Sequence, residues 1–159
     1  MKASPTLASN LQLVLTDLIE LHMQGKQAHW NIVGTNFRDL HLQLDEIIAV
    51  ARQFADEAAE RMRALHALPD GRSQTVSADT RLDEFPAGLT STKDAVKLVT
   101  ARLERTVKTA RDVHDEVDEE DPTSADLLHA IIERLEQLAW MVNAETMAPS
   151  AAVTEPADK

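Results

Sequence analysis

The sequence predicts an all-α fold, a four-helix bundle with one long connection. Hydrophobic residues make up 43% of the 159 positions, but aromatic residues only 3%, and there are just four glycines and six prolines. This composition favours helices over sandwiches and barrels, which need β-branched and aromatic strands with frequent turns. Apolar residues recur at three- and four-residue spacing in four long segments. A chain of this length can form one domain with its own core.

The first helix is expected from about Ser9, after a short, loose N-terminal arm of residues 1–8 that contains Pro5. Gly34 is suited to end the helix, because glycine readily adopts the left-handed conformation of a residue that follows a helix. The side chains at helical spacing are Leu11, Leu15, Leu18, His22, Met23, Lys26, His29, Trp30 and Val33.

The second helix is expected to start at a cap formed by Thr35 or Asn36. A Leu-Pro-Asp-Gly stretch at residues 68–71 ends it. At about 30 residues it would be roughly 45 Å long, which is typical of a helix bundle. Its apolar positions include Phe37, Leu40, Leu44, Ile47, Ile48, Ala51, Phe54, Ala55, Ala58, Met62 and Leu65.

Residues 69–90 form the long connection, with a short helix expected within residues 77–86. Thr90 or Ser91 then starts the third helix, and Asp94 favours its positive N-terminus. The pattern therefore predicts a crossover that joins the second and third long helices.

Residues 118–122 interrupt the pattern, and Thr123 with Asp126 opens the fourth helix. The bundle is thus expected to span residues 9–147. Residues 148–159 are small and polar, so we expect a disordered C-terminal tail.

Charge and composition exclude several classes of function. The formal net charge of −11 repels nucleic acid and anionic membranes and attracts cations. The chain has no cysteine, which excludes disulfides and thiolate metal sites. No apolar run approaches the roughly 18 residues of a membrane span, and the N-terminus makes a poor signal peptide. A cytoplasmic location is expected.

Five metal-ligating side chains stand between positions 29 and 60: His29, His41, Asp45, Asp56 and Glu60. On the second helix His41 and Asp45 are i,i+4 neighbours, and so are Asp56 and Glu60. Asp56 follows Asp45 by 11 residues, close to three turns, so both pairs share one face. They nevertheless lie roughly 16 Å apart along the axis. Because a metal–ligand bond is about 2 Å long, one copy cannot close a site from both pairs.

Two antiparallel copies of the second helix can bring the pairs together. Asp45 and Asp56 lie at equal distances from the point between residues 50 and 51, and so do His41 and Glu60. A two-fold axis at that point places Asp45 near Asp56 of the partner subunit and His41 near Glu60 of the partner subunit. His29 would join from the first helix. Carboxylates with imidazole suit Fe(II), Mn(II) or Zn(II). The alternative without a metal site stays open. Such acidic pairs are usually solvated at the surface, and a lone histidine such as His22 usually has no ligand role.

Residues 28–61 carry short motifs at fixed spacing. His41 follows His29 by 12 residues, and Asp45 follows four residues later. The motifs are Ala28-His29-Trp30-Asn31, Val33-Gly34, Asn36-Phe37, Leu40-His41, Leu44-Asp45 and Ala59-Glu60-Arg61. They resemble the Dps family, the DNA-binding proteins from starved cells, also called mini-ferritins. With the helix order, the resemblance covers roughly residues 9–147.

The resemblance implies a ferritin-like bundle with a short helix in the crossover, and twelve copies in a hollow shell, a homo-dodecamer. It implies a ferroxidase that oxidises Fe(II) with hydrogen peroxide or O2, stores the ferric mineral and so protects against oxidative damage. His29, His41 and Asp45 would come from one subunit, with Asp56 and Glu60 from its partner. Zn(II) or Mn(II) could take the same site.

Four further positions follow from the resemblance. Trp30 would lie beside the metal site, although its spacing fits a core position equally well. Asp126, 14 residues before Trp140, matches the acidic residue that lines a three-fold pore for iron, and Asp121 with Glu120 would widen that pore. The alternative for Asp126 is a carboxylate that stabilises a helix N-terminus.

DNA binding is expected to be weak. Family members that bind DNA typically carry a terminal arm rich in Lys and Arg, whereas the first ten residues here offer only Lys2. One rival function is a nucleoid-compacting, nucleoid-associated DNA-binding protein with secondary iron chemistry. Another is a structural helical assembly without metal. A di-iron centre within one chain is disfavoured, because no Glu stands three residues before a His.

Overall fold

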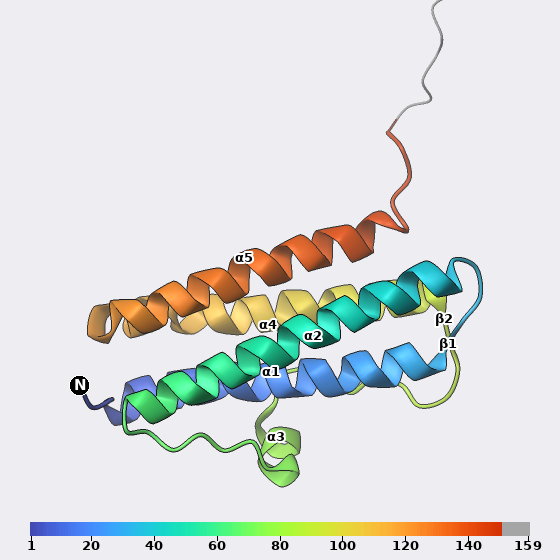
Figure 1. Ribbon diagram of the computed structural model, residues 1–159. Coiled ribbons are helices and arrows are strands. Elements are labelled where there is room, and N and C mark those ends of the chain that lie inside the picture. The colour runs from blue at the N-terminus through green and yellow to red at the C-terminus, as the bar shows by residue number, and fades with distance from the viewer. Residues whose placement is uncertain (151–159) are drawn as a thin grey trace, which may run out of the picture.

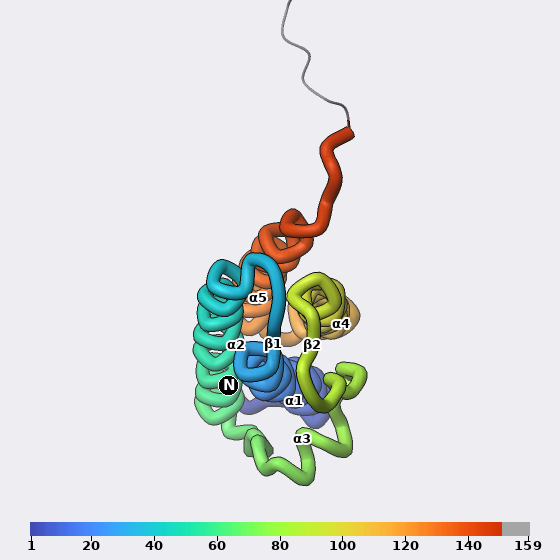
Figure 2. The backbone as a smooth tube through the Cα atoms, turned by 90° about the vertical axis from the view of Figure 1, so that its right-hand side faces the viewer, coloured from blue at the N-terminus to red at the C-terminus, as the bar shows by residue number. Residues whose placement is uncertain are grey.

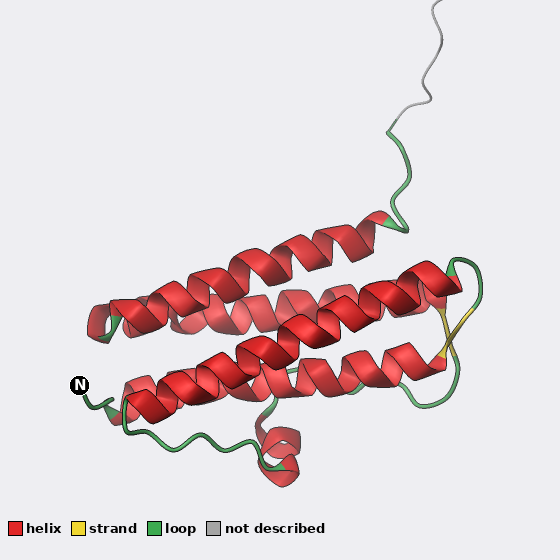
Figure 3. Cartoon of the chain, viewed as in Figure 1, coloured by secondary structure: helices red, strands yellow, loops and turns green. Residues whose placement is uncertain are grey.

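The computed structural model describes residues 1–150, and it is an antiparallel bundle of four long helices (Figures 1 and 3). The elements are α1 (Pro5–Asn31), β1 (Ile32–Val33), α2 (Phe37–Ala64), α3 (Ser73–Asp79), β2 (Thr90–Ser91), α4 (Thr92–Glu120) and α5 (Pro122–Ala144). No helix in the described part is long and apolar enough to cross a lipid bilayer. The predicted all-α bundle is confirmed.

The long connection between α2 and α4 runs the whole length of the bundle (Figure 1). As a result α4 points in the same direction as α2, while α1 packs against α2 and α4 against α5 as antiparallel pairs. Figure 2 shows the connection passing beside α1 and α4. This is the predicted crossover with its short helix. That helix is α3, which begins at Ser73, earlier than the expected 77–86.

The start of α1 corrects the expectation of a loose arm over residues 1–8. Ser4 caps the helix by accepting a hydrogen bond from the Leu7 backbone N–H at 3.1 Å, and Pro5 occupies the first turn. The Ser4 backbone N–H in turn donates to Glu120 at the end of α4, at 2.7 Å. Leu7 is buried. The helix therefore begins four residues before Ser9, because a distant carboxylate holds its cap.

Three other boundaries differ from expectation. α1 ends at Asn31, because β1 then pairs in parallel with β2, with Ile32 opposite Thr90. Gly34 has the expected positive φ of 120°, but it follows this strand and not the helix. α4 continues to Glu120, so only Asp121 separates it from α5. Of the expected tail, residues 151–159 lie outside the described part.

The core lies between the four helices, and most predicted apolar positions are in it. The exceptions are large side chains on the first helix, at its exit and at the start of α2, where Phe37 is 44% exposed. Trp30 is 70% exposed in the single chain, Met23 58% and Val33 43%. The core position considered for Trp30 is therefore wrong.

A buried carboxylate attaches the crossover to the bundle. Asp17 of α1 is fully buried. Its Oδ1 accepts hydrogen bonds from the Thr80 hydroxyl at 3.1 Å and the Arg81 backbone N–H at 2.8 Å. Its Oδ2 accepts one from the Thr109 hydroxyl of α4 at 2.7 Å. One side chain thus joins α1, the crossover and α4.

We expect Asp17→Ala to lower the free energy of unfolding by roughly 2–4 kcal/mol, because it leaves a half-buried backbone N–H and two hydroxyls without their acceptor. Urea denaturation followed by far-UV circular dichroism, at fixed protein concentration, measures this. Asp79→Ala, at an exposed position of α3, is the control and should change stability by less than about 0.5 kcal/mol. Equal effects of the two substitutions would contradict the role of Asp17.

Candidate metal centre

The structure brings three of the five predicted ligands together. His29 near the end of α1 meets His41 and Asp45 in the first turns of α2, and one ligand atom from each lies within 4.8 Å of the others. The two helices approach closely at Gly25, where an added Cβ would lie 2.8 Å from Ile48 Cγ1. Because Gly25 has no side chain, α1 and α2 pack closely here, and ligands from both helices can lie in one cluster.

The imidazole of His29 is nearly buried, and neither of its ring nitrogens has a hydrogen-bond partner among residues 1–150. Its side chain is 11% exposed, and its Nε2 lies 3.0 Å from Asp45 Oδ1. That contact does not have hydrogen-bond geometry, so both ring nitrogens are buried with no hydrogen-bond partner among residues 1–150. Burying polar nitrogen unpaired is unfavourable. A cation that accepts the lone pair of one nitrogen would satisfy that nitrogen.

His41 is oriented by α1. Its ring stacks on that of His29 with the centroids 3.6 Å apart, and its Nδ1 lies 3.2 Å from the His29 carbonyl oxygen. Because a carbonyl only accepts, this contact places the proton on Nδ1 and leaves the lone pair on Nε2. A second hydrogen bond of this kind is the usual way in which a metal-binding histidine is held.

The ammonium of Lys26 favours the charged form of Asp45. The Lys26 ammonium lies 3.1 Å from Asp45 Oδ1. This contact, followed by that with His29, keeps the pKa of Asp45 below its ordinary value, although desolvation acts in the opposite direction. From the sequence, Lys26 is predicted only to lie on the helical stripe. Its i,i+3 spacing from His29 is the one signal that it faces the site.

Two imidazoles and a carboxylate, without thiolate, suit Fe(II) and similar divalent cations. The buried ring nitrogens of His29, which have no hydrogen-bond partner among residues 1–150, are compatible with a metal ion at this cluster. The Lys26 ammonium already sits against Asp45 Oδ1, where it stands in for part of the positive charge of such an ion.

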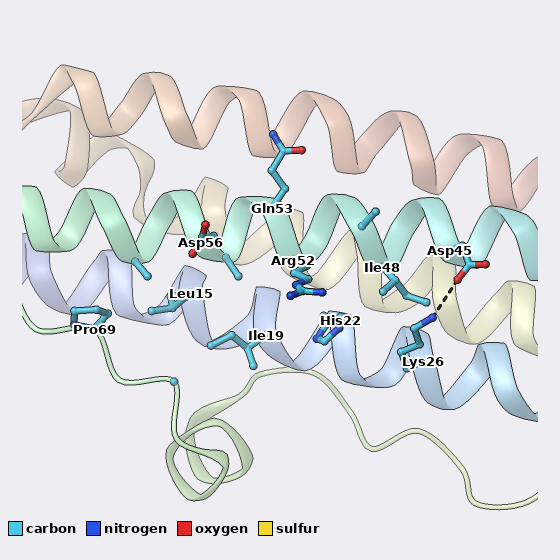
Figure 4. A pocket seen from close by; sticks show the side chains of 14 residues that line it. Leu15, Ile19, His22, Lys26, Asp45, Ile48, Arg52, Gln53, Asp56 and Pro69 are labelled. Atoms are coloured by element: carbon cyan, nitrogen blue, oxygen red, sulfur yellow. Dashed lines mark hydrogen bonds and ion pairs between the residues drawn. The ribbon is translucent and has the colours of Figure 1, made fainter.

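Asp56 and Glu60 are not part of this cluster. Both are on α2, which runs without a break from Phe37 to Ala64, so the axial separation of the two ligand pairs is kept. Asp45 and Asp56 line the same groove of about 800 Å³ between α1 and α2. Figure 4 shows them toward opposite ends of it, with Arg52 and His22 between. The single chain therefore brings together three of the five predicted ligands.

The structure corrects the role expected for Asp121. Its side chain is only 6% exposed, and Arg61 of α2 lies 2.6 Å from its Oδ2. Burial acts to raise the pKa of Asp121, but the Ser124 hydroxyl and the Arg61 guanidinium outweigh it and leave the pKa lowered. This carboxylate is neutralised inside the chain, so it does not form an open acidic pore.

The other predicted positions keep their status as predictions. The Asp126 side chain is 86% exposed near the start of α5, where its Oδ1 lies 3.8 Å from His129 Nδ1. Glu120 accepts hydrogen bonds from Ser4. Trp30 follows His29 directly and is exposed, and no contact in the described part places its ring at the ligands.

The fold and the sequence match known proteins. Residues 8–147 match the ferritin-like domain family. The fine tangled pili major subunit of Haemophilus ducreyi is 36% identical over 87% of this chain and 73% of its own length. DNA protection during starvation protein 2 of Deinococcus radiodurans is 35% identical over 84% of this chain, which spans only 56% of that relative.

A solved structure is similar over nearly its whole length. It is the Dps of Microbacterium arborescens in its high iron form, with a TM-score of 0.84, 32% sequence identity, and coverage of 91% of this chain and 97% of that one. Identity and coverage at this level, together with the match of the family over the bundle, show common descent. The chain belongs to the Dps family of ferritin-like proteins.

Proposed function

We propose that the chain is an iron-storage and detoxification protein, a ferroxidase whose substrate is Fe(II). The observation that carries this is the cluster of His29, His41 and Asp45, in which a buried imidazole has no hydrogen-bond partner for either nitrogen in the described part of the chain. Membership of the Dps family supports it, and the relative from Microbacterium arborescens is described in a high iron form.

The site is completed by a second copy across a two-fold axis near residues 50–51. Asp56 and Glu60 of the partner subunit would then face Asp45 and His41. The groove between α1 and α2 supports this arrangement, because it is open and small side chains, Ala49, Ala55 and Ala59, form part of its lining. Small side chains allow two helices to approach closely. Assembly is then a condition of activity.

The proposed reaction balances with hydrogen peroxide as oxidant. Two Fe(II) ions give one electron each to one hydrogen peroxide, which takes up two protons and leaves as two water molecules. The oxygen–oxygen bond is thus broken by two electrons, and no hydroxyl radical is released. Carboxylates bind Fe(III) more strongly than Fe(II), so Asp45, Asp56 and Glu60 favour the oxidised product. O2 is the alternative oxidant.

Storage follows from assembly into a closed dodecamer, in which oxidised iron collects as a mineral. Asp126 would line the three-fold pore that admits Fe(II), and Trp30 would lie beside the metal centre. A cytoplasmic location belongs to the same proposal, whereas DNA binding, nucleoid association and use of Zn(II) or Mn(II) in place of iron stay sequence predictions.

His41 should be essential for Fe(II) oxidation. We expect His41→Ala to slow Fe(II) oxidation by peroxide about a hundredfold, because the site loses an imidazole ligand, while size-exclusion chromatography shows the assembly intact. Stopped-flow absorbance of Fe(III) measures the rate. His66→Asn is the control, since His66 is exposed at a φ of 59° that asparagine tolerates. An unchanged rate of Fe(II) oxidation in His41→Ala would contradict the assignment of His41 to the metal site.

Mixing two inactive variants tests whether the site is shared. When His41→Ala and Glu60→Ala subunits are unfolded together and reassembled, each mixed dimer has one intact site and one doubly defective site. With random pairing about a quarter of all sites should recover, as two-fold symmetry requires. Stopped-flow activity of the mixture, against each variant reassembled alone, is the measurement. A mixture no more active than its components would exclude a shared site.

Lys26 should compete with the metal ion for Asp45. We expect Lys26→Met to bind the redox-inert probe Zn(II) several-fold more tightly than the wild type, because no ammonium remains 3.1 Å from Asp45 Oδ1. Calorimetric titration measures the affinity. Lys97→Met on α4, with a side chain 63% exposed, removes the same charge far from the centre in sequence. Weaker binding in Lys26→Met than in Lys97→Met would show that Lys26 helps to hold the cation.

A further inference from the structure

A group of arginines lies apart from the metal centre, where the crossover passes beside α4 (Figure 2). Arg81 comes from the crossover, and Arg102 and Arg105 come from one turn of α4. They line a hollow of about 360 Å³. Its other lining residues are Leu82, Asp83 and Ala101.

The guanidinium of Arg102 is buried and is held in place by neutral groups. The residue is 7% exposed. Its Nε donates to Gln24 Oε1 at 3.0 Å, and its terminal nitrogens donate to the carbonyl oxygens of Asp83 at 3.1 Å, Glu84 at 2.9 Å and Leu98 at 3.3 Å. These acceptors orient the group but carry no charge. A buried charge without a counter-charge is unfavourable, so the site favours an anion.

Arg81 and Arg105 add donors that the chain does not use. Arg105 Nε donates to the Arg81 carbonyl oxygen at 3.3 Å. Across residues 1–150 the terminal nitrogens of Arg105 and the whole guanidinium of Arg81 have no hydrogen-bond acceptor, and neither arginine, nor Arg102, has a carboxylate within 4.0 Å. Four other arginines do have such a carboxylate: Arg61, Arg72, Arg111 and Arg134.

The carboxylates nearby leave the hollow positive. Asp112 is close enough for Arg81 and Arg105 to help lower its pKa, but Lys108 is the main cause, since its ammonium lies 2.7 and 2.8 Å from the two carboxylate oxygens. Asp83 is the one acidic residue that lines the hollow within residues 1–150, against three arginines. The formal charge of the lining is thus positive, on a chain whose net charge is −11.

We propose that this hollow binds a phosphate group. Guanidinium is permanently charged, and its planar fork donates two parallel hydrogen bonds to phosphate oxygens. Arg102 is fixed by its carbonyl partners at the base, and Arg81 and Arg105 supply free forks from two different elements. The phosphate comes either from free inorganic phosphate or from the backbone of a nucleic acid. The proposal is independent of the iron chemistry, because none of the proposed metal ligands lines the hollow.

Calorimetric titration of the full-length chain with inorganic phosphate, at low ionic strength, tests the site. We expect one saturable site per chain, and at least about a tenfold loss of affinity in the double variant R81Q/R105Q, since each charge-assisted hydrogen bond lost is large on the scale of a tenfold change. Arg102 is left intact because it holds the crossover. The control is K93Q/K97Q, which removes the same charge from α4 and should bind phosphate as the wild type does.

A second titration with a short DNA duplex identifies the source of the phosphate. Binding of DNA that R81Q/R105Q loses and K93Q/K97Q keeps assigns the site to nucleic acid, whereas phosphate binding without DNA binding assigns it to free phosphate. R81K/R105K keeps the positive charges but loses the planar guanidinium groups. It should therefore bind phosphate with an affinity between those of the wild type and R81Q/R105Q. Should the double variant not fold, R81Q alone replaces it. The proposal is overturned if the wild type binds neither ligand, or if the glutamine variant binds like the wild type.

Discussion

The length of α2, which runs without a break, determines which metal ligands one chain can bring together. α2 carries two pairs of ligand side chains on one face, and the helical rise holds them roughly 16 Å apart. His41 and Asp45 find His29 on the neighbouring helix, because Gly25 lets α1 and α2 approach closely. Asp56 cannot reach that cluster within the same chain. The chemistry proposed for the site therefore depends on a second copy, and the groove along α1 and α2 is the surface that such a copy would cover.

Acidic residues outnumber Lys and Arg by 27 to 16 in this chain, so the placement of its positive charges matters. One ammonium, that of Lys26, lies against Asp45 at the metal centre. The guanidinium of Arg61 neutralises Asp121 and ties α2 to the start of α5. The arginines beside the crossover have no carboxylate within ion-pair distance in the described part of the chain. A strongly negative molecule attracts Fe(II) at long range, and it can still present a local site for a phosphate group.

Much of the fold, and the three ligands that meet within one chain, could be predicted from the spacing of residues that are near in sequence. Helical periodicity is a property of nearby residues, so the four long helices and the crossover could be placed from the sequence. The same regular rise converts the positions of Asp45 and Asp56 in the sequence directly into their separation along the helix axis. The pairing of His29 with His41 followed from motif spacing. Boundaries were less accurate, as the start of α1 at Pro5 shows.

What the sequence by itself determined was therefore the set of helices and the separation of the ligand pairs along α2, because both depend on the geometry of one helix. Only the tertiary structure decided which charges meet. Arg61 reaches Asp121 from 60 residues away, and Lys26 reaches Asp45 from 19 residues away. Such contacts depend on how helices pack, which periodicity does not encode. For that reason the pore position that the resemblance implied for Asp121 could not be checked in the sequence, whereas packing buries the side chain in an ion pair with Arg61.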